Sequence, residues 1–229
     1  MVGWASAIWS SSMNPIVVIN PNSTQAVTDG IDLALEPLRM AGGPPVRCVT
    51  LAEGPPGIES QEDADSVVAP TCNLIRRKGA DTAAFVIACY SDPGLREARE
   101  TTSKPVLGIA ESAMLTALTR GSRFGVISIL EQSISRHERY VHALGLEARC
   151  AGDRAIGIGV TELTDESRVL ERMVSVGNQL REEDGADVLI MGCAGMARYR
   201  RRLETATGLP VIDPTQAAVT LAIGAVQLK

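Results

Sequence analysis

Two segments far apart in the chain carry the same short pattern, and this repeat restricts the possible folds more than any other feature. Residues 79–89 read GADTAAFVIAC and residues 185–193 read GADVLIMGC. In each copy, a turn and a helical stretch follow the cysteine. A strand that begins with proline comes next, at Pro105 in the first copy and Pro210 in the second. A repeat of this kind predicts two similar α/β units related by a pseudo-twofold axis.

Short runs rich in Val and Ile alternate with longer amphipathic segments. The helical spacing of apolar residues predicts helices over 60–78 and 165–181. The runs that read as strands are 15–19, 46–51, 83–88, 105–109, 124–128, 187–192 and 210–212, with a weaker one near 146–151. Because aromatic residues make up only 3% of the chain, aliphatic side chains must fill the core, as in parallel strands covered by helices. The alternation predicts an α/β fold with two pseudo-symmetric, Rossmann-like domains and mainly parallel sheets.

The repeat also suggests how the chain is divided. We expect residues 14–108, together with about 213–229, to form the first half, because the final helix can return to pack on it. Residues 109–212 would form the second half. Residues 1–13 contain no Lys or Arg and no continuous apolar run, so we expect a disordered extension rather than a signal peptide. Open parallel sheets hold ligands at the carboxyl ends of their strands, which places the site in the cleft between the halves.

Charge and composition restrict the partners. A net charge of −5 disfavours nucleic acid, and no apolar run is long enough to cross a membrane. The basic run of residues 198–202 reads as a solvated helix face. Five cysteines without a secretory signal predict a cytoplasmic protein with reduced thiols. The apolar segment 215–228 favours a homo-oligomer, and the expected partner is a small-molecule substrate.

Two cysteines occupy the same place in the two copies of the repeat, at the end of a buried strand. Cys89 precedes YSDPG, in which Asp92 is a candidate N-cap for the next helix, and Cys193 precedes a tight Ala-Gly-Met turn. A helix start can stabilise a thiolate or a developing oxyanion. A single cysteine at the end of an apolar strand is more often a core residue. Equivalent positions in two facing repeats favour a catalytic pair.

The other candidate residues have simpler interpretations. The three remaining cysteines lie in or beside predicted strands or in a helix, and we expect structural roles for them: Cys48, Cys72 and Cys150. His137 and His142 are expected at a helix surface or core edge and form no convincing metal pair. INPNST at 19–24 places Asn20 at a strand end, where its amide could bind a substrate amide or carboxylate, or merely serve the turn.

INPNST, ACYSDPG and MGCAGM, in this order and spacing, resemble the aspartate/glutamate/hydantoin racemase superfamily, and within it the hydantoin and allantoin racemases. The resemblance extends from Asn14 over nearly the whole chain. It implies two pseudo-symmetric α/β domains, an active site between them, and no metal or other cofactor. Its paired catalytic cysteines map onto Cys89 and Cys193. Its substrate-holding positions map onto Asn20, Tyr90, Ser91, Ser128, Ile129 and Ala194.

The chain departs from the family pattern in two places of the expected substrate pocket. The loop GPPGIES has Gly57 where relatives often have a serine, and Ser128-Ile129 stands where many have two threonines. These departures bear on the substrate more than on the chemistry.

We therefore expect a cofactor-independent racemase that inverts a hydantoin-like or amino-acid-like substrate with two opposed cysteines. An aspartate or glutamate racemase, an arylmalonate-type decarboxylase and a maleate-type isomerase are alternatives on the same scaffold. The decarboxylase keeps only the second cysteine, so Cys89 counts against it. A non-catalytic binding module is a further alternative, although binding alone does not require paired cysteines.

Overall fold

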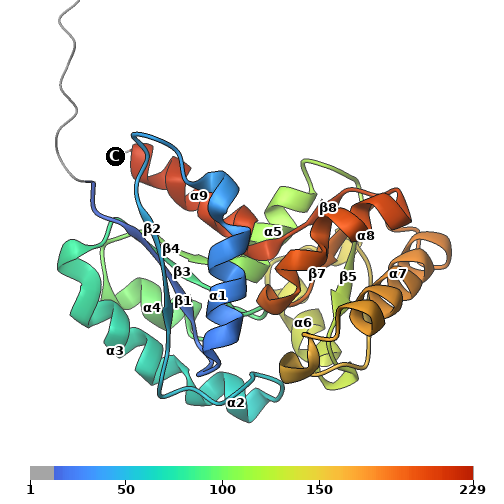
Figure 1. Ribbon diagram of the computed structural model, residues 1–229, viewed down its shortest axis with the longest axis horizontal. Coiled ribbons are helices and arrows are strands. Elements are labelled where there is room, and N and C mark those ends of the chain that lie inside the picture. Colours follow the sequence, from blue (N-terminus) through green and yellow to red (C-terminus); the bar gives the residue numbers. More distant parts are fainter. Residues whose placement is uncertain (1–12, 229) are drawn as a thin grey trace, which may run out of the picture.

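Two parallel four-stranded sheets form the framework of the protein (Figure 1). The computed structural model describes residues 13–228, so the predicted disordered extension, apart from Met13, lies outside the described residues. The strand orders are β2-β1-β3-β4 and β6-β5-β7-β8, and all the strand pairs are parallel. The second sheet thus repeats the order of the first. The predicted α/β fold of two similar, parallel units is confirmed.

The central strands are buried along their whole length, as continuous apolar runs predict. The edge strands β2 and β6 are partly exposed. In chain order the strands are β1 Ile16–Asn20, β2 Val46–Thr50, β3 Ala84–Ile87, β4 Val106–Gly108, β5 Phe124–Ser128, β6 Cys150–Ala155, β7 Val188–Met191 and β8 Val211–Ile212.

Helices connect successive strands and cover both sheets (Figure 1). The α-helices are α1 Gln25–Ala34, α2 Gln61–Ser66, α3 Val68–Lys78, α4 Leu95–Thr101, α5 Ile109–Ala117, α6 Glu131–Ala143, α7 Glu166–Glu182, α8 Arg200–Thr207 and α9 Pro214–Gln227. Short 3-10 helices are η1 Glu36–Leu38, η2 Gly79–Asp81, η3 Glu147–Arg149, η4 Val160–Glu162 and η5 Ala194–Tyr199. In the described part of the chain, none of these helices has the length and apolar character needed to cross a membrane.

Two elements differ from the sequence-based expectation. The helix expected over 60–78 is broken at Val67, which ends α2 and begins α3. Pro70 lies in the first turn of α3, and its missing N–H removes a hydrogen bond that a continuous helix would need. The weak strand expected near 146–151 begins only at Cys150, because residues 147–149 form the 3-10 turn η3. The helix predicted over 165–181 is confirmed as α7, with Asp165 as its N-cap.

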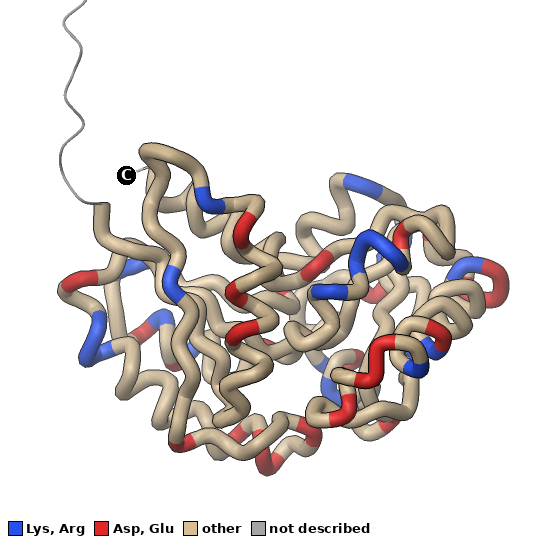
Figure 2. The backbone as a smooth tube through the Cα atoms, viewed as in Figure 1, with Lys and Arg blue, Asp and Glu red and all other residues tan. Residues whose placement is uncertain are grey.

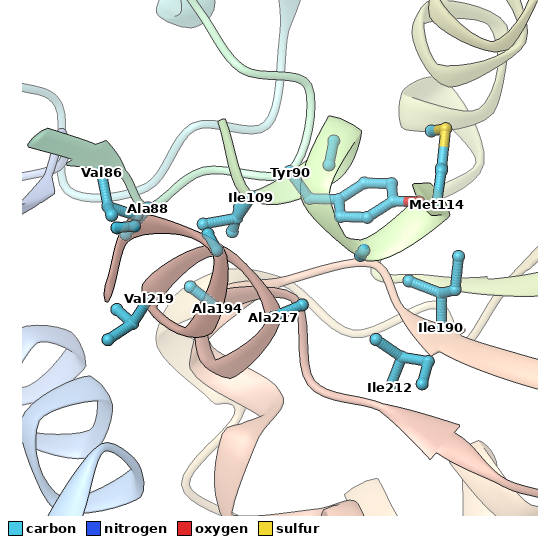
Figure 3. Packing of buried hydrophobic residues seen from close by; sticks show 14 of the residues in the cluster. Val86, Ala88, Tyr90, Ile109, Met114, Ile190, Ala194, Ile212, Ala217 and Val219 are labelled. Carbon is cyan, nitrogen blue, oxygen red and sulfur yellow. The ribbon is translucent and has the colours of Figure 1, made fainter. Parts of the chain in front are cut away.

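The two sheets share one hydrophobic core. Its buried members include Val86 of β3 and Ile190 of β7 (Figure 3). Helix α9 follows the last strand of the second sheet and packs on α5, β3 and β4. Figure 3 shows Ala217 and Val219 of α9 among the side chains of this core. The halves are therefore joined along this side.

Basic and acidic residues are intermingled along the backbone of both halves (Figure 2). In the basic run of residues 198–202, three arginines have acidic partners. Arg198 and Arg202 pair with Glu166, and Arg200 pairs with Glu204. This agrees with the expected solvated helix face.

Candidate active site

Cys89 and Cys193 line one small cavity at the carboxyl ends of the two sheets. Each cysteine lies two residues beyond its strand, after β3 and after β7 respectively. The cavity has a volume of about 30 Å³, and both halves contribute to its wall. The other lining residues are Asn22, Val27, Ile58, Ala88, Tyr90, Ile129, Ser133, Arg136, His137, Val160, Gly192, Ala194 and Gly195. The fold thus brings the two cysteines of the repeat together.

Burial dominates the electrostatics of both thiols. The pKa of Cys89 is raised to about 12, mainly by desolvation and also by the nearby Cys193, while Arg136 and Ser91 act in the opposite direction. Desolvation likewise raises the pKa of Cys193 to about 11, against the hydrogen bond from the Gly195 backbone. The expected stabilisation of thiolate by helix starts is therefore outweighed. Helix α4 begins only at Leu95, six residues after Cys89.

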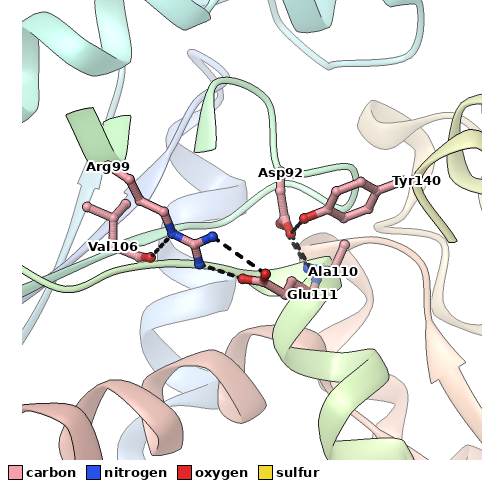
Figure 4. A network of polar contacts seen from close by, with 6 residues as sticks. All are labelled: Asp92, Arg99, Val106, Ala110, Glu111 and Tyr140. Atoms are coloured by element: carbon pink, nitrogen blue, oxygen red, sulfur yellow. Dashed lines mark hydrogen bonds and ion pairs between the residues drawn. The ribbon is translucent and has the colours of Figure 1, made fainter. Parts of the chain in front are cut away.

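The turn after Cys89 has an unusual backbone. Ser91 has φ 150° and Asp92 has φ 50°, conformations that disfavour side chains other than glycine. The expected role of Asp92 as a cap for the next helix is wrong, because Gly94 occupies the N-cap of α4. The Asp92 carboxylate instead accepts the backbone N–H groups of Ala110 (2.9 Å) and Glu111 (2.8 Å) at the start of α5 (Figure 4). It caps a distant helix and ties the cysteine turn to it.

One helix of the second half contacts each residue of this turn. Nε of Arg136 donates to Oγ of Ser91 (3.2 Å), and Nε2 of His137 donates to the Tyr90 carbonyl (3.1 Å). The Tyr140 hydroxyl donates to the Asp92 carboxylate (2.9 Å; Figure 4). Burial raises the pKa of Asp92 to about 7, although the Tyr140 hydroxyl and the two backbone N–H groups at the start of α5 act to lower it. We call the three α6 side chains, Arg136, His137 and Tyr140, the α6 clasp.

The two histidines differ from each other. His137 is buried, with 2% of its surface exposed, rather than at the helix surface. Its Nδ1 lies 2.8 Å from a carboxylate oxygen of Asp153, and its ring stands edge-on to Tyr90. A lone polar residue on the buried face of α6 could not be distinguished by spacing from a residue at the helix edge. His142 is exposed, as expected, and bonds to Glu147.

Asn20 lies beneath the INPNST turn, with its side chain bonded to the protein. Its Nδ2 donates to Oδ1 of Asn22 (2.9 Å) and to Oγ1 of Thr28 (3.0 Å), and its Oδ1 accepts the Asn22 N–H (3.2 Å). Asn22 lines the cavity instead. The Oδ1 of Asn22 also accepts the backbone N–H of Thr24 (3.0 Å), which leaves its Nδ2 to donate to a ligand.

The remaining predicted binding residues fall into two groups. Tyr90, Ile129 and Ala194 line the cavity. Ser91 and Ser128 lie behind the wall. Ser91 bonds Arg136, and the buried hydroxyl of Ser128 bonds Asp153 and His137.

Among the lining residues outside the predicted site set, four have polar side chains: Asn22, Ser133, Arg136 and His137. The last three belong to α6, which follows β5 as α1 follows β1. Applying the repeat to these helices would have found them. The Ser133 and Tyr90 hydroxyls are buried without a hydrogen-bond partner in the described residues.

The GPPGIES loop of the first half lies against the second half. Ile58 lines the cavity, and the Glu59 carboxylate accepts the backbone N–H of Val160 (2.8 Å). A Cβ on Gly57 would lie 3.0 Å from the Val160 side chain, so glycine permits this close approach. Within residues 13–228, acidic, cysteine and histidine side chains form no group of three suited to a metal ion.

Comparisons with known proteins agree with this geometry. The Asp/Glu/Hydantoin racemase family model matches residues 16–222. The hydantoin racemase of Pseudomonas sp. (strain NS671) is 38% identical over 211 residues, which cover 90% of this chain and 84% of that protein. The solved allantoin racemase from Klebsiella pneumoniae is 33% identical, with a TM-score of 0.85 and coverage of 93% and 88%. The allantoin racemase from Pseudomonas fluorescens is 29% identical, with a TM-score of 0.87 and coverage of 93% and 91%.

Proposed function

Since the chain belongs to the Asp/Glu/hydantoin racemase family, we propose that this racemase inverts a 5-substituted hydantoin or allantoin by proton transfer between Cys89 and Cys193. The observation that carries the proposal is the pair of equivalent cysteines in one cavity. Racemisation removes a proton from one face of a carbon and adds one to the other. Two bases on opposite walls can do this without moving across the substrate.

The proton transfer requires one thiolate and one thiol. The thiolate takes the α-proton as the C–H bond breaks, and the opposite S–H then gives its proton to the carbon. The raised pKa of each thiol makes its thiolate a stronger base, at the expense of the fraction ionised. Once one thiol has ionised, its charge opposes ionisation of the other, and the pair titrates as a unit. This favours the mixed state that the reaction needs.

A hydantoin ring suits such a site. Its C–H lies between a carbonyl and a nitrogen, so the carbanion is stabilised within the substrate and no cofactor is required. The developing oxyanion needs hydrogen-bond donors, and the candidates in the wall are Nδ2 of Asn22 and the Ser133 hydroxyl. Val27, Ile58 and Val160 offer an apolar surface for the ring substituent.

The substrate must enter by moving part of the wall. A volume of about 30 Å³ holds about one water molecule and not a five-membered ring. The GPPGIES loop is the segment we expect to move, because it contributes Ile58 to the cavity wall and contacts the second half through Glu59. Closure over a bound ring would exclude water and strengthen the electrostatic interactions inside.

Chiral chromatography on a panel of substrates tests the function. The panel contains both enantiomers of several 5-substituted hydantoins, allantoin, aspartate and glutamate, each corrected for racemisation without enzyme. We expect fast inversion of one or more hydantoins or of allantoin. Inversion of aspartate or glutamate alone would replace the proposed substrate class. A lack of inversion for the whole panel would contradict the proposed function.

A further inference from the structure

The α6 clasp delivers a fixed positive charge to one of the two cysteines. Arg136 is 8% exposed and is the one Lys or Arg among the described residues that line the cavity. A guanidinium keeps its charge at every pH that the protein tolerates. Its Nε donates to Oγ of Ser91, two residues after Cys89. Because that hydroxyl accepts from Arg136, its own proton is free to point elsewhere.

The second cysteine has no such arrangement. Helix α1 occupies the position in the first half that α6 occupies in the second, and it packs on η5, the turn after Cys193. Its sequence, QAVTDGIDLA, contains no Lys or Arg, and Val27 is its residue in the cavity wall. The sulfur of Cys193 receives a backbone hydrogen bond from Gly195, and Glu59 is the charged group that acts on it. Pseudo-symmetry therefore holds for the fold and fails for the charge.

From this asymmetry we propose that Arg136 is a positioning residue, which stabilises the Cys89 thiolate through the Ser91 hydroxyl and leaves Cys193 unaffected. The Ser91 hydroxyl donates to the sulfur, and the guanidinium holds that hydroxyl in place. The link to catalysis rests on the proposed function, since only a two-base reaction needs a thiolate at Cys89.

The other charged and titratable groups around Cys89 oppose its ionisation or are paired elsewhere. Cys193 and Asp92 both raise the pKa of Cys89, whereas Arg136 and Ser91 lower it. His137 is paired with Asp153 on the far side of the turn. Arg136 also acts on Asp63 of α2, so part of its field is directed away from the cavity. Without Arg136, no fixed cation in the described cavity wall would offset the effect of Cys193 and Asp92, which raise the pKa of Cys89.

Alkylation of each cysteine over a range of pH tests the proposal without any substrate. Wild type, Arg136→Met, Arg136→Lys and Ser91→Ala are treated with iodoacetamide, and mass spectrometry gives the rate at Cys89 and at Cys193. Arg139→Met is the matched control, because Arg139 lies on the same helix and bonds Gln61 at the surface.

We expect Arg136→Met and Ser91→Ala to move the alkylation midpoint of Cys89 upward by about one pH unit, with Arg136→Lys in between. The midpoint of Cys193 and both midpoints of Arg139→Met should stay at the wild-type values. An unchanged Cys89 midpoint in Arg136→Met, or equal shifts at both cysteines, would overturn the proposal. If Arg136→Met does not fold, a Cys89 midpoint in Ser91→Ala equal to that of the wild type would overturn the proposal. A wild-type protein that inverts no substrate would contradict the proposed function and leave this measurement intact.

Discussion

The turns that follow the two cysteines lie at equivalent places in a repeated fold, yet different interactions hold them. The turn after Cys89 combines two residues at positive φ with polar contacts from the α6 clasp and a buried carboxylate, Asp92. The turn after Cys193 is a regular 3-10 helix, η5, against which α1 packs, a helix without Lys or Arg. The repeat therefore fixes where the thiols lie, while the side chains around them decide how each thiol ionises. Two bases in a pseudo-symmetric site need not be equivalent.

The largest expected effect is the loss of either base. Cys89→Ala and Cys193→Ala should each lower racemisation by about a thousandfold or more, because inversion needs a proton donor on the far face. Both cysteines are only partly buried, so the variants should fold. Cys48→Ala is the control, since Cys48 lies on β2 outside the cavity, and it should racemise normally. Chiral chromatography measures racemisation by all three variants. Normal racemisation by Cys89→Ala or Cys193→Ala would contradict a requirement for both cysteines.

The next effect concerns Asp92, which only the first turn contains. Its pKa is raised from 3.8 to about 7 by burial, so the folded protein binds this proton more tightly than the unfolded chain. The stabilisation from this proton is complete below pH 4 and is lost as the pH rises through 7. Between pH 5 and pH 8, the loss of this stabilisation should lower the free energy of unfolding by about 3 kcal/mol. Urea unfolding at a series of pH values measures this change. In Asp92→Asn, the fall in the free energy of unfolding from pH 5 to pH 8 should be smaller than in the wild type by that amount.

Asp81→Asn, at an exposed position of η2, is the control for this pH dependence and should follow the wild type. Asp213, the N-cap of α9, has its pKa raised by burial to about 6 and contributes a decline of the same sign in every variant. A slope in Asp92→Asn equal to that of the wild type would show that the buried carboxylate does not titrate as described.

Asn20 and Ser128 are the last residues of the equivalent strands β1 and β5, and both are buried. Asn20→Ala should lower the free energy of unfolding by about 2 kcal/mol, because it leaves several buried partners without a hydrogen bond. Ser128→Ala should lower it by about 1 kcal/mol. Asn22→Ala should instead impair turnover with little change in stability. Denaturant unfolding and kinetics on the same preparations separate these effects. A stable but inactive Asn20→Ala would make Asn20 a direct substrate contact after all.

The smallest effect is expected at Tyr140. Tyr140→Phe removes one donor to the Asp92 carboxylate and keeps the ring, so it should lower the free energy of unfolding by about 1 kcal/mol. The two backbone N–H groups from the start of α5 remain. In an Asp92→Asn background, Tyr140→Phe should lower the free energy of unfolding by less than it does in the wild type. A double-mutant cycle measures this difference. Equal losses in both backgrounds would mean that the hydroxyl does not act through Asp92.

Much of the fold could be predicted from the sequence because its main signals are local. Apolar runs and the repeated GAD pattern indicated parallel strands in two units, and the repeat also predicted that Cys89 and Cys193 would meet. Long-range hydrogen bonds could not be predicted in this way. Asp92 caps a helix that begins 17 residues later, at Ile109, whereas the N-cap of the nearby helix α4 is Gly94. No local pattern reports such a contact.

The site also depended on side-chain direction and burial. At the end of β1 the inward-pointing Asn20 supports the turn and Asn22 reaches the cavity, although both are asparagines in one short motif. His137 of α6 was expected at a helix surface or core edge, because spacing does not show that it is buried. The thiols were expected to be acidic from nearby helix starts, whereas burial has the larger influence on their pKa.

Exchange in deuterated water tests the opposed-cysteine account most directly. Cys89→Ser and Cys193→Ser are incubated with each enantiomer of a hydantoin that the wild type inverts, and mass spectrometry and chiral chromatography follow deuterium uptake and configuration. A serine hydroxyl stays protonated near neutral pH, so each variant keeps one base. We predict that each variant exchanges the α-hydrogen of one enantiomer without inverting it, and that the two variants exchange opposite enantiomers. Exchange of the same enantiomer by both, or inversion by either, would contradict the account.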